Sequence, residues 1–267
     1  MSLATIAMFW DGPPFSLIER LCISSFLSVG HPVVLYSYEP IEGVPEGVEL
    51  RPATDILPRP DQILRHERTG SAGIHSDKFR YHLLAKWPGV IWADTDAYCL
   101  APFIPKDGYF FGREGDEVVA SGVVAMPAGS PTLQGLIEFF EDEYAIPPWM
   151  MPKHKREMRA RAEAGDPMHV SEMPWGAWGP KALSHFLRSS GEFDRSLAPH
   201  VLYPIPFKDR RVYFRQAWKA WKMVEDDTVS IHFYGCRVRA GLATRFGGIP
   251  PEGSILEELC RKHGVDY

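Results

Sequence analysis

The sequence predicts an α/β protein with a mostly parallel central sheet flanked by helices, and two patterns carry the prediction. An apolar run at residues 5–10 is followed by a helical pattern and then by a second apolar run at residues 33–38. Further along, another helical pattern precedes the apolar run at residues 89–93. Strand, helix and strand at this spacing form the βαβ unit of a parallel sheet.

The first expected helix has clear signals at both ends. Turn residues Asp-Gly-Pro-Pro at 11–14 end the first strand, and Ser16 with Glu19 three residues later forms a capping box. Apolar residues then recur at helical spacing as far as Val29. Gly30 stands where a C-terminal cap is expected. A helix is therefore expected between these two caps.

The rest of the chain continues as helices and strands, with one long irregular connection. Residues 39–73 are rich in Pro and Gly and are expected to be irregular, apart from a short strand at 48–50. Ser76 is expected to cap a helix that runs to Trp87. Further helices are expected at 131–143, with Ser130 as cap and Pro131 first, at 180–189 and at 254–263. Further strands are expected at 109–111, 118–126, 201–205 and 229–234.

Composition and charge describe an ordinary globular chain. Of 267 residues, 45% are hydrophobic and 24% are charged, so a sizeable core can form. The net charge of −5 gives no electrostatic support for general nucleic-acid binding, and no nucleic-acid partner is expected.

The cysteines and the lengths of the apolar runs indicate the expected cellular location of the protein. Cys22, Cys99, Cys236 and Cys260 are scattered without a C-x-x-C pair, so we expect reduced thiols. No run approaches the roughly 18 apolar residues of a transmembrane helix. The N-terminus has no basic segment followed by an apolar stretch. A cytoplasmic protein is expected on these grounds.

The triplet Asp94-Thr95-Asp96 is the most informative feature of the chain, because it directly follows the apolar run 89–93. Ligands of α/β sheets bind at the carboxyl ends of the strands. Two carboxylates there supply the oxygen donors that Mg²⁺ and Mn²⁺ prefer while these ions carry a substrate's phosphates. The other interpretation is a solvated acidic turn.

Four segments share a pattern in order and spacing: Trp10-Asp11-Gly12, residues 76–81 (Ser-Asp-Lys-Phe-Arg-Tyr), residues 89–96, and Gly179-Pro180. Together they resemble the glycosyltransferases with a sugar-binding DXD region, the group that includes α-1,4-galactosyltransferases and initiation-specific α-1,6-mannosyltransferases. The resemblance covers most of the chain and is strongest from about Ser76 to Pro102. It implies a GT-A fold with a Rossmann-like mixed sheet, a nucleotide-sugar donor, a divalent metal and transfer with retention at the anomeric carbon.

The resemblance implies a metal site of Asp94, Asp96 and His232 for Mn²⁺ or Mg²⁺. Asp96 would hold the metal, and Asp94 would lie toward the ribose or a metal-bound water. Strand alternation puts Ser230, His232 and Tyr234 on one face. Related transferases use a late His as a metal ligand, and imidazole suits Mn²⁺ better than Mg²⁺. Alternatively, His232 is a core histidine satisfied by a neighbour.

Donor binding is expected at the ends of the first strands. Phe9 and Trp10 end the first strand, where the base would lie, although core packing explains either residue equally well. Asp77 and Arg80 share one helical face. By resemblance Asp77 would contact the nucleoside, and Arg80 the donor's phosphate or sugar; the alternative is a local ion pair.

Two further segments are expected to contact sugars. Ser121-Gly122 lies where relatives carry an Asn-containing segment along the donor sugar, and this departure leaves the sugar's identity open. Trp175 and Trp178, before Gly179, are expected to form a stacking wall for the acceptor, since pyranose C–H faces pack on indole rings. The alternative is that both tryptophans fill the core.

A basic run, residues 153–161, begins with Lys153 and ends with Arg161. Such a run is usually a solvated helix face. The functional alternative is attraction to an anionic acceptor or, as peripheral contact, to the inner face of a membrane, helped by Trp149 and Met150.

The expected function is a metal-dependent, retaining hexosyltransferase that moves a hexose or N-acetylhexosamine from a nucleotide diphosphate sugar, with UDP as the expected nucleotide. The acceptor would be a glycan or glycolipid in polysaccharide synthesis. One domain, 1–267, is expected, with donor binding in residues 1–130 and acceptor binding in 131–267. No protein base is assigned, because the resemblance implies a retaining transfer in which the leaving phosphate itself can take the acceptor's proton.

Two alternatives remain open. Haloacid-dehalogenase-like phosphatases also place Asp-x-Asp after an apolar strand, with the first Asp as nucleophile. Asp226-Asp227 could mimic their second acidic motif, yet 93 residues precede Asp94 and Asp226-Asp227 precedes its strand. The other alternative is a catalytically inactive module that binds sugar or nucleotide.

Overall fold

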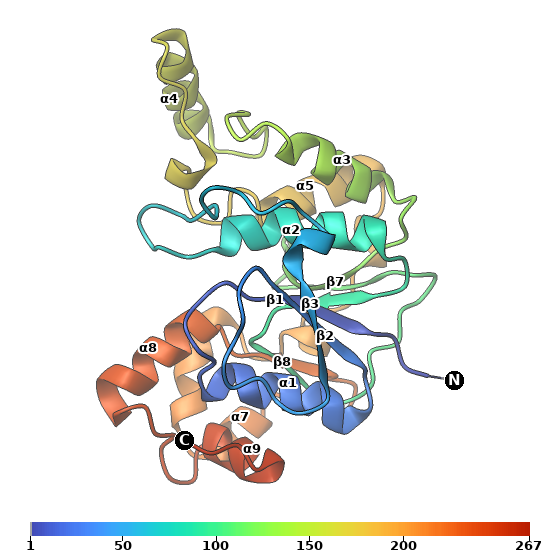
Figure 1. Ribbon diagram of the computed structural model, residues 1–267, viewed down its shortest axis with the longest axis vertical. Helices are drawn as coiled ribbons and strands as arrows, with labels where there is room; N and C mark the ends of the chain where they lie inside the picture. The colour runs from blue at the N-terminus through green and yellow to red at the C-terminus, as the bar shows by residue number, and fades with distance from the viewer. Residues whose placement is uncertain (1) are drawn as a thin grey trace.

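A mixed six-stranded sheet lies at the centre of the computed structural model, which describes residues 2–267 (Figure 1). In spatial order its strands are β3 (Val48–Pro52), β2 (Val33–Ser37), β1 (Ile6–Phe9), β4 (Ile91–Ala93), β7 (Val119–Ala125) and β6 (Phe110–Arg113). Strands β3, β2, β1 and β4 pair in parallel, whereas β7 is antiparallel to both β4 and β6. The predicted α/β architecture with a mixed, mostly parallel sheet is confirmed.

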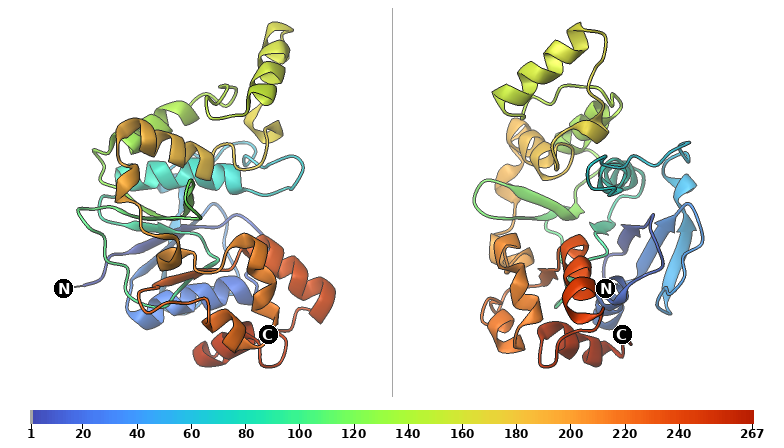
Figure 2. Two further views of the ribbon diagram at one scale, coloured as in Figure 1. Left: turned by 180° about the vertical axis from the view of Figure 1, so that it is seen from behind. Right: turned by 90° about the vertical axis from the view of Figure 1, so that its left-hand side faces the viewer.

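Helices cover both faces of this sheet (Figures 1 and 2). On one face lie α2 (Gly73–Lys86), α3 (Pro131–Phe140) and α5 (Pro180–Ser190); on the other lie α1 (Leu17–Val29) and, behind it, α9 (Ile255–His263). Alternation along β1 explains the two layers, because Ala7 and Phe9 pack with Phe79 of α2 while Ile6 and Met8 pack with Phe26 of α1. The sheet is therefore buried on both sides, as parallel sheets are.

A second, two-stranded sheet joins the middle of the chain to its C-terminal part. Strand β5 (Ala97–Cys99) pairs antiparallel with β8 (Ser230–His232), and Ala97 lies opposite His232. The remaining elements are η1 (Ala53–Asp55), α4 (Pro152–Glu163), η2 (Val170–Glu172), η3 (Phe193–Arg195), α6 (Pro199–Leu202), η4 (Phe207–Phe214), α7 (Ala217–Trp221) and α8 (Gly235–Phe246). The pairing of β5 with β8 brings the late histidine beside the acidic triplet.

The expected ends of α1 are confirmed. Ser16 and Glu19 form the capping box, and Gly30 closes the helix in the left-handed conformation with φ of 100°. The helices expected near 131–143, 180–189 and 254–263 are present as α3, α5 and α9.

Two expectations were wrong. Ser76 does not cap α2, because the helix already begins at Gly73, whose N–H donates to Ser71 Oγ at 3.1 Å. The strand expected at 201–205 is instead the short helix α6, since Pro199 starts a helical turn in which Tyr203 N–H donates to the Pro199 carbonyl at 2.8 Å. Helices α7 and α8 were not expected at all.

Among residues 2–267, no helix combines the length and the apolar character that crossing a bilayer requires.

Candidate functional site

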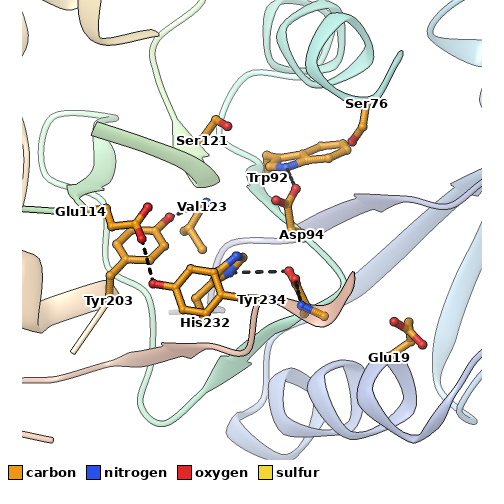
Figure 3. A network of polar contacts seen from close by, with 12 residues as sticks. Glu19, Ser76, Trp92, Asp94, Glu114, Ser121, Val123, Tyr203, His232 and Tyr234 are labelled. Atoms are coloured by element: carbon orange, nitrogen blue, oxygen red, sulfur yellow. Dashed lines mark hydrogen bonds and ion pairs between the residues drawn. The ribbon is translucent and has the colours of Figure 1, made fainter. Parts of the chain in front are cut away.

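The acidic triplet leaves β4 and enters β5, and His232 ends β8 directly beside it (Figure 3). One ligand atom from each of Asp94, Asp96 and His232 lies within 4.8 Å of the other two. The three side chains come from segments nearly 140 residues apart in the chain, and all three are only partly accessible. The sequence-predicted metal ligands therefore converge on one point.

Asp94 is oriented through one of its two oxygens. Its Oδ1 accepts hydrogen bonds from Trp92 Nε1 at 2.9 Å and from Arg80 Nη2 at 3.2 Å. Its Oδ2 lies on the other side: a Cβ placed on Gly122 would be 3.3 Å from both Asp94 Oδ2 and His232 Nδ1. Burial raises the pKa of Asp94, and the neighbouring Arg80 guanidinium opposes that rise. Asp94 is thus held so that one oxygen remains for a ligand.

Asp96 is positioned by the start of α8. Its Oδ2 accepts a hydrogen bond from the Gly235 N–H at 2.6 Å, and its backbone carbonyl accepts one from Phe233 N–H at 2.9 Å. Its Oδ1 lies 3.5 Å from His232 Nδ1. Neither of these two buried atoms has a hydrogen-bond partner within residues 2–267. Buried polar atoms normally find a partner, so this pair is the part of the site that a cation would complete.

The donor set fits a divalent metal. Two carboxylates and one imidazole are borderline-hard ligands that suit Mn²⁺, and Mg²⁺ to a lesser extent.

The imidazole of His232 is held between two tyrosine rings (Figure 3). The ring of Tyr203 meets it edge-on at 5.6 Å, and that of Tyr234 does so at 4.9 Å and 89°. The Tyr203 hydroxyl accepts from Val123 N–H at 3.1 Å, and the Tyr234 hydroxyl donates to Glu114 Oε1 at 3.0 Å. Burial raises the pKa of both tyrosines, so both hydroxyls stay protonated. These contacts fix the orientation of the imidazole.

Gly122 is needed for the approach of these ligands. A Cβ at this position would lie 3.0 Å from His232 Cε1, closer than carbon atoms normally pack. The Gly122 carbonyl accepts a hydrogen bond from Asp94 N–H at 2.7 Å. The structure thus places this residue, which we expected to line the donor sugar, against Asp94 and His232.

Arg80 is buried and is shared by two carboxylates. Its Nη2 lies 3.2 Å from both Asp77 Oδ1 and Asp94 Oδ1, its Nη1 donates to the Ser121 carbonyl, and its guanidinium lies 4.9 Å from the centre of the Trp92 ring. Burial raises the pKa of Asp77 to about 7, against the lowering effect of Arg80. The local ion pair is present, and Arg80 in addition orients Asp94.

The two aromatic residues at the end of β1 have different environments. Phe9 is buried and stacks on Phe79, with ring centroids 4.6 Å apart. Trp10 is partly exposed, and the guanidinium of Arg239 lies 5.7 Å from the centre of its ring. Of this pair, only Trp10 is partly accessible to solvent.

Arg239 is a candidate that the sequence analysis missed. It forms an ion pair with Glu19, whose carboxylate is completely buried at the start of α1. A Cβ on Gly235 would lie 2.8 Å from Arg239 Nη1 and 3.2 Å from Asp96 Oδ2, so the guanidinium lies beside Asp96. Because Gly235 and Gly241 weaken the helical pattern of α8, no signal in the sequence placed this side chain.

The residues expected to contact the acceptor are not equally accessible. Trp178 is 1% exposed and stacks flat on Phe140, with centroids 4.3 Å apart. Trp175 is 51% exposed and meets His66 edge-on. Gly179 approaches Asp77 so closely that a Cβ would lie 3.1 Å from its Oδ2. Trp178 is thus part of the core, and Trp175 alone of the two tryptophans presents a ring at the surface.

Comparisons with known proteins found no matching family model and no matching curated protein. Two solved structures are similar to the chain in part. The PaToxG glycosyltransferase is 14% identical with a TM-score of 0.41, over 70% of this chain and 69% of that one. The apo structure of the bifunctional glycosyltransferase WbbM is 17% identical with a TM-score of 0.28, over 51% of this chain and 28% of that one.

Proposed function

We propose that this protein is a metal-dependent glycosyltransferase of GT-A type that moves a hexose or N-acetylhexosamine from a nucleotide diphosphate sugar, with UDP as the expected nucleotide, to a glycan or glycolipid. The observation that carries the proposal is the convergence of Asp94, Asp96 and His232 at the carboxyl end of β4. Asp96 Oδ1 and His232 Nδ1 lie 3.5 Å apart there, and both are buried without a hydrogen-bond partner among residues 2–267. An inert acidic turn does not require such an arrangement.

The divalent cation would be held by Asp94, Asp96 and His232. When bound, it would offset the negative charge that develops on the departing diphosphate. Arg80, Trp92 and Tyr234 keep these ligands in place through the contacts described above. The preorganised geometry limits reorganisation when charge develops in the transition state.

Arg239 and Trp10 flank the position proposed for the donor. The Glu19 carboxylate orients the Arg239 guanidinium, whose planar fork suits a diphosphate. We propose that the partly exposed Trp10, at the end of β1, contacts the nucleoside. Asp77, Ser121 and Gly122 remain proposed donor contacts, and Trp175 and Gly179 proposed acceptor contacts.

No side chain is assigned as catalytic base. Glu114 is a further carboxylate near the site, because it accepts a hydrogen bond from Tyr234, whose ring contacts the imidazole of His232. We propose that the departing phosphate takes the proton of the acceptor hydroxyl, as in retaining transfer without a protein base.

The test is a donor screen with Mn²⁺ that measures nucleotide diphosphate release from a panel of nucleotide sugars, with an EDTA control. Release from one donor that stops in EDTA supports the proposal. Asp96→Asn serves as the matched variant, because an amide still accepts the Gly235 hydrogen bond and preserves the start of α8. Full Mn²⁺-dependent release by Asp96→Asn would contradict the assigned ligand.

The same screen separates the two alternatives. Phosphate release from a simple phosphomonoester would favour the phosphatase, but Asp227 pairs with His200 at 3.0 Å and groups with Glu225 instead of with Asp94. Metal-dependent binding of a nucleotide diphosphate without turnover on any acceptor would favour the inactive module.

A further inference from the structure

One end of the molecule carries a basic surface with exposed aromatic rings that the proposed reaction does not use. It consists of residues 207–222, which form η4 and α7, and residues 245–249 at the end of α8; we call it the basic aromatic surface. Residues 207–222 contain six Lys or Arg and one Asp, a net charge of +5 by subtraction, although the whole chain carries −5. This asymmetry concentrates positive charge at one place.

The cations of this segment are available to an outside partner. Across residues 2–267, no ion pair involves any of the six Lys or Arg side chains of residues 207–222. Three of them lie over aromatic rings instead: Arg210 is 4.0 Å from the centre of the Phe207 ring, and Lys219 and Lys222 are 5.4 Å and 4.5 Å from the centre of the Trp218 ring. Cations placed beside exposed rings are the pattern of a membrane-interface segment.

Large apolar side chains are exposed among these charges. Trp218 and Ile249 are each 54% exposed, Phe207 is 41% exposed, and Phe246 is 36% exposed. The ring of Phe214 contacts that of Phe246 with centroids 5.4 Å apart, so η4 and the end of α8 form one surface. Exposed Trp, Phe and Ile next to Lys and Arg suit the interface of a bilayer. There the rings would lie at the level of the headgroups, and the Lys and Arg side chains would contact the phosphates.

We propose that the basic aromatic surface docks on an anionic phospholipid bilayer. Charge complementarity supplies the attraction, at about 1 kcal/mol for each Lys or Arg near such a surface. The exposed rings distinguish this partner from a purely polar polyanion, which would leave Trp218 and Ile249 in water. Docking is independent of the proposed sugar transfer.

Helix α4 is the competing membrane contact expected from the sequence, through residues 153–161. Figures 1 and 2 place α4 at one end of the molecule and α7, α8 and α9 at the other, so the two contacts can be tested separately. Of the apolar residues near α4, Met151 is 63% exposed, whereas Met158 is buried and the helix itself contains no Trp, Tyr or Phe beside its cations. The exposed apolar side chains therefore favour the basic aromatic surface over α4 as the membrane contact.

The basic aromatic surface continues into the candidate site. The ring of Phe207 meets that of Tyr234 edge-on at 5.2 Å, and Tyr234 in turn contacts His232. Docking would bring the metal ligands close to the bilayer, which favours an acceptor anchored in lipid; this consequence, unlike docking, rests on the proposed function.

The experiment is co-sedimentation of the full chain with vesicles of phosphatidylglycerol and phosphatidylcholine in equal parts, compared with phosphatidylcholine alone. We expect binding to the anionic vesicles that weakens with added salt. Lys219→Gln with Lys222→Gln should weaken binding about 30-fold, from two lost charges. Trp218→Ala, which keeps the charge, should weaken it about 10-fold through lost apolar burial.

The matched control is Lys153→Gln with Lys155→Gln on α4, which removes the same charge at the opposite end and should leave vesicle binding unchanged. Loss of binding in this control but not in the Lys219 and Lys222 variant would overturn the proposal, as would equal sedimentation with both kinds of vesicle. Tight binding to a soluble polyanion such as heparin, with no effect of Trp218→Ala, would identify a polyanionic partner and also overturn it. Nucleotide release measured without vesicles reports on the proposed transfer separately.

Discussion

Replacing Gly122 by Ala probes the proposed metal ligands without removing any of them. The added Cβ would stand 3.0 Å from His232 Cε1 and 3.3 Å from Asp94 Oδ2. Carbon atoms pack at about 3.5–4.0 Å, so the imidazole must retreat by roughly 0.5 Å. Tyr203 and Tyr234 enclose that ring and oppose the movement.

The expected effect is a selective loss of metal affinity. Metal–ligand distances tolerate deviations of about 0.2 Å, less than the displacement that the methyl group imposes. Disturbing the surroundings of ligands typically lowers metal affinity on the order of 10–100-fold. Metal-free stability should change by no more than about 1 kcal/mol, because Ala in a strand also relieves the entropic cost of Gly.

The assay is Mn²⁺ titration followed by the electron paramagnetic resonance signal of the free ion, alongside thermal unfolding in EDTA. Gly129→Ala is the matched control, since a Cβ there meets nothing within 4 Å. If Gly122→Ala binds Mn²⁺ as the unaltered protein does, the ligands do not meet at this point and the reasoning fails. Absence of Mn²⁺ binding by the unaltered protein would refute the metal centre itself.

Three further predictions concern Arg239, Asp77 and Trp178. Arg239→Gln should weaken binding of a nucleotide diphosphate about 10–100-fold in calorimetric titrations while leaving Mn²⁺ binding intact, and exposed Arg237→Gln should change neither. Burial raises the pKa of Asp77 from 3.8 to about 7, so between these values the folded protein keeps a proton that the unfolded chain has already released. The free energy of unfolding of the metal-free protein should therefore fall as the pH rises from 4 to 7, by at most about 1.4 kcal/mol per pH unit. Asp77→Asn should flatten that slope in urea titrations, and an unchanged slope would assign it to other groups. Trp178→Ala should lower the free energy of unfolding in urea by about 3–5 kcal/mol, as expected for a core indole. A small loss of stability together with a selective loss of acceptor binding would instead indicate that Trp178 contacts the acceptor.

Local signals were enough for much of the framework. The capping box of Ser16 and Glu19 and the glycine at residue 30 bounded α1, because caps act within a few residues of the helix ends. The apolar runs predicted β1, β2 and β4, since buried parallel strands are continuously apolar. Helices α7 and α8 were not predicted, because charged residues and Gly interrupt the apolar periodicity of their sequences and tertiary packing stabilises the helices.

The order of residues along the chain was sufficient to place Asp94 and Asp96 after a buried strand and to nominate His232, since side-chain chemistry and strand ends are local properties. Only the three-dimensional fold shows that these three side chains lie together and that two carboxylates share Arg80. It also shows that Trp178 is buried and that Arg239 lies beside Asp96. These contacts join segments up to about 220 residues apart through the pairing of β5 with β8 and the packing of α8 on α1, and no local pattern encodes the distance between side chains so far apart.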